Sequence, residues 1–148
     1  MEAKCINNKG SYPVLTIPKN ATKSISNSNY VSSHEWYTIE GEMVGYPLSV
    51  GNIYKVYAIL IFNDTYRFLV FDNDNLPQFY PSELFECVET SLPIDCHFCS
   101  YEAYDSMFLF IGPDCINNYQ SFVDLIDLDS NAISKLIEYK CFLDEWDN

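Results

Sequence analysis

Between residues 52 and 111, the hydrophobic positions follow the spacing that is typical of β-strands. The strongest segment, Asn52–Phe62, is a nearly continuous run of β-branched, aromatic and aliphatic residues, which favours a strand. The turn residues Asn63 and Asp64 separate it from a second strand, Tyr66–Asp72, so the two are expected to form a hairpin. Further strands are expected at Leu84–Val88, Asp95–Tyr101 and Met107–Ile111.

After residue 111 the hydrophobic spacing changes from that of strands to that of helices. Asp114 follows Gly112 and Pro113, and is the expected N-cap of a first helix. Asp129 or Ser130 is expected to cap a second helix. The apolar positions of the first helix are Ile116, Tyr119, Phe122, Val123 and Ile126, and those of the second are Ile133, Leu136, Ile137, Cys141 and Leu143.

These elements predict one α+β domain over residues 1–148. Residues 48–111 are expected to form a small, partly open antiparallel β-barrel or curved sheet. Residues 112–148 add the two C-terminal helices. Residues 1–47 are expected to be an N-terminal extension or added strands, with short strands at 14–17 and 34–40.

The acidic charge lies almost entirely in the second half of the chain. The formal net charge of −13 divides into +1 for residues 1–70 and −14 for residues 71–148. This balance argues against binding to nucleic-acid phosphates or to an anionic membrane surface, because both need Lys and Arg. The asymmetry favours a surface that attracts a cationic partner. The alternative is that the carboxylates only keep a small domain soluble.

The sequence contains no recognisable targeting or membrane-spanning segment. The first nine residues have no apolar core of a signal peptide, and the longest apolar run, Val56–Phe62, is too short to cross a bilayer. We therefore expect a cytoplasmic protein. In that compartment its six cysteines are expected to be free thiols rather than disulfides.

One motif carries possible chemistry of its own. Cys96 and Cys99 form a Cys-x-x-Cys pair, which occurs in redox and zinc-binding proteins. The pair is expected on a strand, where residues three apart point to opposite faces. No second ligand pair follows at zinc-site spacing, and no nucleophile or phosphate-binding motif is present. We therefore expect no enzyme and no cofactor, and keep a small Cys-based redox or zinc protein as the alternative.

Several segments resemble immunity proteins of bacterial polymorphic toxin systems, including those of contact-dependent growth inhibition. Residues 48–59, 68–74 and 77–86 look like the strands and turn of a small Src-homology-type barrel. Residues 112–140 are similar to the tail of these immunity proteins, most clearly over 118–127. The resemblance implies a small acidic cytosolic protein that binds and blocks a cognate toxin domain, and it brings no active-site residues.

The charge pattern agrees with this resemblance. A nuclease toxin carries a basic cleft, and an inhibitor that presents carboxylates and tyrosines to it gains steering and complementarity. We expect the partner to be such a toxin domain, and the inhibitor itself to be a monomer. The candidate partner-binding residues are Asp124, Asp127, Asp129, Asp144, Glu145, Tyr119 and Tyr104.

Overall fold

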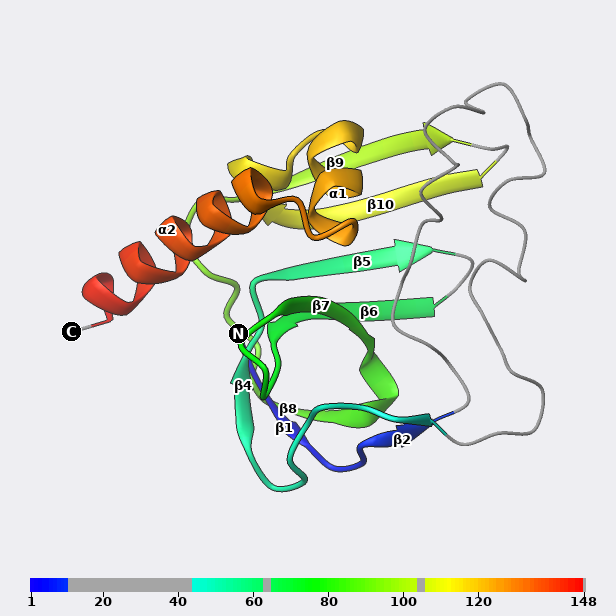
Figure 1. Ribbon diagram of the computed structural model, residues 1–148, viewed down its shortest axis with the longest axis vertical. Helices are drawn as coiled ribbons and strands as arrows, with labels where there is room; N and C mark the ends of the chain where they lie inside the picture. The colour runs from blue at the N-terminus through cyan, green and yellow to red at the C-terminus, as the bar shows by residue number, and fades with distance from the viewer. Residues whose placement is uncertain (11–43, 63–64, 104–105, 148) are drawn as a thin grey trace.

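The computed structural model describes residues 1–10, 44–62, 65–103 and 106–147. The strands expected at 14–17 and 34–40 lie outside these ranges. The described residues form two open antiparallel sheets followed by two C-terminal helices (Figure 1). This arrangement confirms the predicted α+β class, with sheets that curve and remain open.

The smaller sheet is built from segments that are distant in sequence. Its strand order is β4-β1-β8, with β1 at Glu2–Cys5, β4 at Ile53–Lys55 and β8 at Phe85–Glu89. The N-terminus, expected as an extension or as added strands, therefore provides the central strand of this sheet. A separate short pair joins β2 (Lys9–Gly10) to β3 (Val44–Gly45).

The larger sheet has five strands in the order β7-β6-β5-β10-β9. It contains the predicted hairpin β5–β6 and a second hairpin, β9–β10, whose register runs from Cys96 opposite Pro113 to Ala103 opposite Ser106. The bounds of its strands are Ala58–Phe62 (β5), Thr65–Phe71 (β6), Pro77–Pro81 (β7), Cys96–Ala103 (β9) and Ser106–Pro113 (β10).

The single strand predicted over residues 52–62 is two strands, β4 and β5. The chain passes from the smaller sheet to the larger one at Val56 and Tyr57, both of which are buried. The amide of Val56 donates to the carbonyl of Met1, whereas the amide of Tyr57 donates to the carbonyl of Leu69. The two consecutive amides thus bond to different sheets, and the chain must turn between them. The prediction of a single strand was wrong here.

Two hydrophobic cores explain why β6 and β7 lack a clear alternation of apolar and polar residues. One face of this strand pair packs toward the helices through Leu69, Phe71 and Phe79. The other face packs toward the smaller sheet through Phe68, Val70 and Tyr80. Strands buried on both faces read as continuous apolar runs. In β5 only alternate residues are buried, because its second face is partly open.

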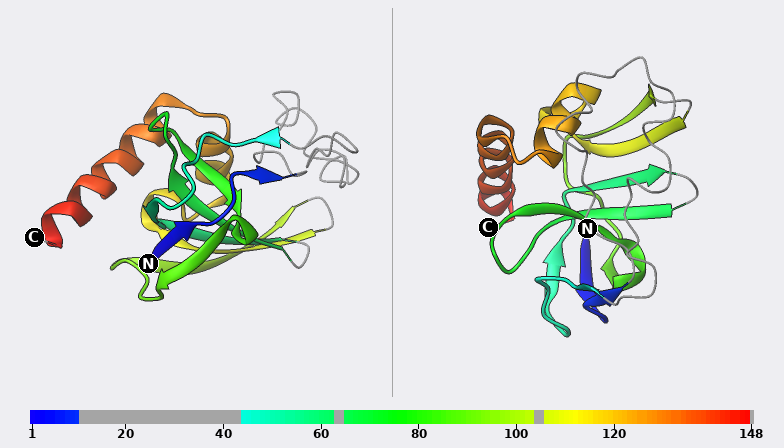
Figure 2. Two further views of the ribbon diagram at one scale, coloured as in Figure 1. Left: turned by 90° about the horizontal axis from the view of Figure 1, so that it is seen from below. Right: turned by 45° about the vertical axis from the view of Figure 1, so that its right-hand side comes forward.

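The helices cover one face of the larger sheet (Figure 2). Helix α1 spans Tyr119–Ile126 and α2 spans Ser130–Trp146. Asp114 begins a 3₁₀ turn rather than α1, which is capped by the Asn118 side chain accepting from the amide of Ser121. The prediction of Asp114 as the N-cap was therefore wrong. Asp129 caps α2 as predicted, and its carboxylate accepts from the amides of Asn131 and Ala132.

Candidate functional site: the far end of the C-terminal helix

Three of the predicted carboxylates lie around the turn between the two helices. Asp124 accepts a hydrogen bond of 2.6 Å from the Gln120 side chain, and Asp129 caps α2. Asp127 is the C-cap residue of α1 and is exposed. Asp124 and Asp129 line a pocket of about 300 Å³ together with Cys115, Ser121, Asn131, Ala132 and Lys135. At least two of these three acids therefore have hydrogen-bonding roles inside the fold.

Asp144 and Glu145 lie at the other end of α2. With a helical rise of 1.5 Å per residue, Asp129 and Asp144 are roughly 22 Å apart along the axis. The structure thus separates the five predicted carboxylates into two groups, one at each end of this helix. Figure 1 shows that the C-terminal half of α2 extends past the larger sheet.

The two predicted tyrosines have different outcomes. Tyr119 is half-buried, and its ring contacts Tyr101, Phe108 and Phe122, with centroid distances of 6.1, 6.4 and 6.3 Å. These contacts place Tyr119 against the core between the helices and the larger sheet, which we call the main core, rather than on an open surface. Tyr104 lies outside the described residues.

An aromatic ladder on α2 was missing from the sequence-based candidates. Tyr139, Phe142 and Trp146 are spaced three and four residues apart, so they are neighbours along one side of the helix. Their ring centroids are 6.5 Å apart for the first pair and 6.2 Å for the second. Exposure rises along the ladder, because Tyr139 is half-buried while Phe142 is 40% and Trp146 66% exposed. The signal that could have revealed it is the spacing of these aromatics beside acidic residues.

Acidic side chains flank the exposed part of this ladder. Glu138 and Glu145 are both exposed. At 100° per residue, positions 138, 142, 145 and 146 fall on one side of the helix. We call Glu138, Phe142, Glu145 and Trp146 the α2 surface. It offers a large exposed aromatic side chain, a residue type that is enriched among the strongest contacts of protein interfaces, with carboxylates around it.

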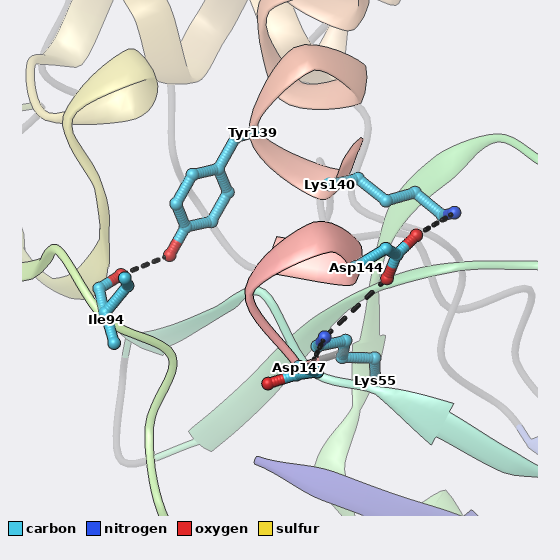
Figure 3. A network of polar contacts seen from close by, with 6 residues as sticks. All are labelled: Lys55, Ile94, Tyr139, Lys140, Asp144 and Asp147. Atoms are coloured by element: carbon cyan, nitrogen blue, oxygen red, sulfur yellow. Dashed lines mark hydrogen bonds and ion pairs between the residues drawn. The ribbon is translucent and has the colours of Figure 1, made fainter. Parts of the chain in front are cut away.

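Polar contacts hold the end of α2 against the smaller sheet (Figure 3). The ammonium of Lys55 on β4 forms ion pairs with Asp144, at 3.7 Å, and with Asp147. Lys140 forms a second ion pair with Asp144 at 3.1 Å. Leu143 is buried beneath them. Asp144, a predicted partner-binding residue, therefore orients the helix and is partly neutralised within the molecule.

Tyr139 holds α2 at a second point, against the segment that precedes β9. Its hydroxyl donates a 2.6 Å hydrogen bond to the carbonyl of Ile94, which precedes β9 (Figure 3). Burial raises the pKa of this hydroxyl, and the neighbouring Cys96 adds to the rise. Tyr139 therefore stays a neutral donor at physiological pH. The ladder begins at a residue that the fold holds in place, and Phe142 and Trp146 extend from it.

We expect loss of the Lys55 ion pairs to loosen the end of α2. In Lys55→Met, Asp144 and Asp147 lose their partner on β4 while the apolar stem of the side chain is retained. Because these pairs are near the surface and share one ammonium group, the two together contribute about 1 kcal/mol. Amide hydrogen exchange over residues 140–147 should therefore accelerate up to about fivefold. Lys9→Met, which removes an exposed lysine on β2, should leave this segment unchanged, and equal effects in the two variants would contradict the role of Lys55.

The Cys-x-x-Cys pair lies on β9, as predicted. The Cys96 sulfur is 3.9 Å from the hydroxyl of Tyr139, while Cys99 packs against the main core. Burial raises the pKa of the Cys96 thiol, and the pKa of the nearby Cys115 rises to about 11 for the same reason. Across the described ranges, no three His, Cys, Asp or Glu side chains are grouped to hold a metal ion.

These thiols should differ in reactivity toward iodoacetamide. A thiol with a pKa of about 11 is ionised in about one molecule per thousand at pH 8, and only the thiolate attacks. We expect the exposed Cys87 and Cys141 to be alkylated first, and Cys115 and Cys96 at least tenfold more slowly. Mass mapping of a labelling time course measures the order. Rapid labelling of both Cys96 and Cys99 in the folded protein would instead support the redox alternative.

Comparisons with protein-family models, curated proteins and solved structures found no match. Neither of the helices described above has the length and apolar character needed to cross a membrane.

Proposed function

We propose that the protein is an immunity-type inhibitor that binds and neutralises a basic toxin domain through the α2 surface. The observation that carries this proposal is Trp146, which is 66% exposed at the end of a helix that is anchored by ion pairs. A large aromatic side chain held in the open beside Glu138 and Glu145 gains most from burial against a partner. The sequence resemblance adds the class of partner.

Charge supports a basic partner. Residues 71–148 carry a net charge of −14; α2 lies in this half, and its own net charge is −1, from three acids and two lysines. A strongly negative surface attracts a basic cleft over distances beyond direct contact and raises the association rate. A toxin domain that cleaves nucleic acid has such a cleft, because it binds phosphates. Inhibition then requires tight association and no turnover by the inhibitor.

The test uses the product of the gene directly upstream, where the toxin of such a pair is expected. We expect a one-to-one complex that abolishes the toxin's activity in vitro. We also expect its association rate to fall at least tenfold between about 50 and about 500 mM NaCl, since salt screens steering. An upstream product that is not a toxin, or a toxin that the protein neither binds nor inhibits, would overturn the proposal.

A matched pair of variants tests the surface. Glu138→Gln combined with Glu145→Gln should slow association with the toxin, because it removes two charges from the α2 surface. Glu83→Gln combined with Glu89→Gln removes two charges from other exposed positions, and it should slow association less. Equal slowing in the two double variants would mean that net charge attracts the partner and that the α2 surface does not contact it.

The Cys-based alternative stays a prediction. The stoichiometry of zinc in the purified protein tests it, together with the alkylation order described above.

A further inference from the structure

The outer strand β9 is a free sheet edge of unusual composition. Its eight residues make it, with β10, the longest strand of the larger sheet, and within the described ranges it pairs with β10 alone. Figure 1 and the right-hand view of Figure 2 show it at the border of the sheet. Edge strands are normally protected from pairing by proline, lysine, a bulge or short length. The opposite edge, β7, begins and ends with proline, whereas β9 contains neither proline nor lysine.

The face beside this edge is apolar and faces away from the helices. The strand register places Phe98, Ile111 and Ile59 in one row across β9, β10 and β5. Leu109 and Ile61 form the next row. Phe98 is 65% exposed, and Met107 on β10 is 53% exposed. Apolar side chains therefore cluster on this face up to the free edge, which is typical of a surface that is covered in an assembly.

We propose that β9 pairs with β9 of a second copy of this chain, in an antiparallel arrangement centred on Cys99. A twofold axis at Cys99 places Phe98 opposite Ser100 of the second copy. The two Phe98 side chains then lie on the same face as diagonal neighbours, a separation that aromatic side chains span. Main-chain hydrogen bonds along the edge supply the remaining contacts, as in other strand-addition complexes. The two larger sheets become one continuous sheet.

The charge distribution fits this occupant despite the net charge of −13. Within β9 the only Asp, Glu, His, Lys or Arg side chains are His97, which contacts Asp114 at 3.3 Å, and Glu102. In the register centred on Cys99, His97 lies opposite Tyr101 and Glu102 lies opposite Cys96. No like charges face each other, so the central contact meets no local repulsion.

The antiparallel direction also keeps the acidic helices apart. The beginning of β9 lies beside α2, because Cys96 is 3.9 Å from Tyr139. In this register Cys96 of one copy lies opposite Glu102 of the other, so antiparallel pairing places the two beginnings six residues, or roughly 20 Å, apart and the two α2 helices at opposite ends of the strand pair. This separation exceeds the distance of about 10 Å over which charges interact at 0.1 M salt. The α2 surface stays free in the pair, so the inference does not depend on the proposed function.

Sedimentation of the full chain at several protein concentrations tests the pairing. One edge strand and its flanking residues make a small interface, so we expect a weak dimer that forms above roughly 10–100 µM. The weight-average mass should rise from 17.1 kDa toward twice that value. Salt should strengthen the dimer by screening repulsion, whereas salt weakens binding to a basic partner. The opposite salt effects therefore distinguish a failure of the β9 pairing from a failure of the proposed toxin binding.

Variants at the edge and away from it make the test specific. Phe98→Lys adds a charge at the centre of the pairing and should lower the association constant at least tenfold, and Ser100→Lys should act alike. Tyr66→Lys changes a side chain of similar exposure, 53%, on β6, and it should leave association unchanged. Circular dichroism confirms that each variant is folded. A constant mass of 17.1 kDa at high protein and salt concentration, or wild-type association by folded Phe98→Lys, would overturn the proposal.

Discussion

Phe122→Ala should lower the free energy of unfolding by about 3–5 kcal/mol, which is a large share of the stability of a small domain. Phe122 is fully buried on α1, and its ring lies 5.6 Å from Phe79 and 6.0 Å from Phe108. Phe79 is on β7 and Phe108 is on β10, so Phe122 packs α1 against two separated strands of the larger sheet. Removing its ring leaves a cavity that rigid strands cannot close. Urea unfolding followed by circular dichroism measures the loss.

Phe142→Ala is the control for this prediction. It makes the same chemical change in the other C-terminal helix, at a side chain that is 40% exposed. Because less apolar area is lost and no closed cavity forms, we expect a decrease of no more than about 1 kcal/mol. Similar losses in the two variants would show that the core between the sheet and α1 does not dominate stability.

Trp146→Ala should weaken binding to the toxin partner by at least about 2 kcal/mol, or roughly 30-fold, while the free protein keeps its stability. Trp146 contacts Phe142 in the aromatic ladder and otherwise exposes most of its surface. Truncation therefore removes little from the fold but takes away the largest apolar group of the α2 surface. Calorimetric titration of the partner, with thermal unfolding of the free variant, measures both quantities.

The matched control is Tyr66→Ala. Tyr66 is 53% exposed on β6, so its truncation removes a large exposed aromatic ring from a different surface. Binding of the partner should change by less than about threefold. If Trp146→Ala binds the partner with wild-type affinity, the partner contacts another part of the molecule.

The sequence predicts the strands well where side-chain spacing alone decides the structure. The hairpin β5–β6, the strands β9 and β10, and a cap of α2 at Asp129 or Ser130 follow from local residues; they are confirmed, with Asp129 as the cap. The break at Val56 and Tyr57 could not be predicted, because it depends on which distant carbonyls, those of Met1 and Leu69, accept their amide hydrogen bonds. Hydrophobicity is the same on either side of the break.

The candidate site could be predicted only in part, for a related reason. The sequence indicates that the C-terminal half is acidic, but it cannot show which carboxylates the fold itself uses. Asp129 caps a helix, and Asp144 pairs with a lysine on β4 that is far away in sequence. The second helix also exposes Ile137 and Cys141, which spacing had assigned to its apolar face. Its buried residues are Ala132, Leu136 and Leu143.

The central position of β1 affects how the chain folds during synthesis. This strand is synthesised before both of its neighbours, β4 and β8, which begin at Ile53 and Phe85. At 5–20 residues per second, synthesis of the intervening chain takes about 4–16 s. During that time β1 has no strand to pair with on at least one side. The smaller sheet is therefore complete only after β8 has been synthesised, and Glu2–Cys5 must remain accessible until then.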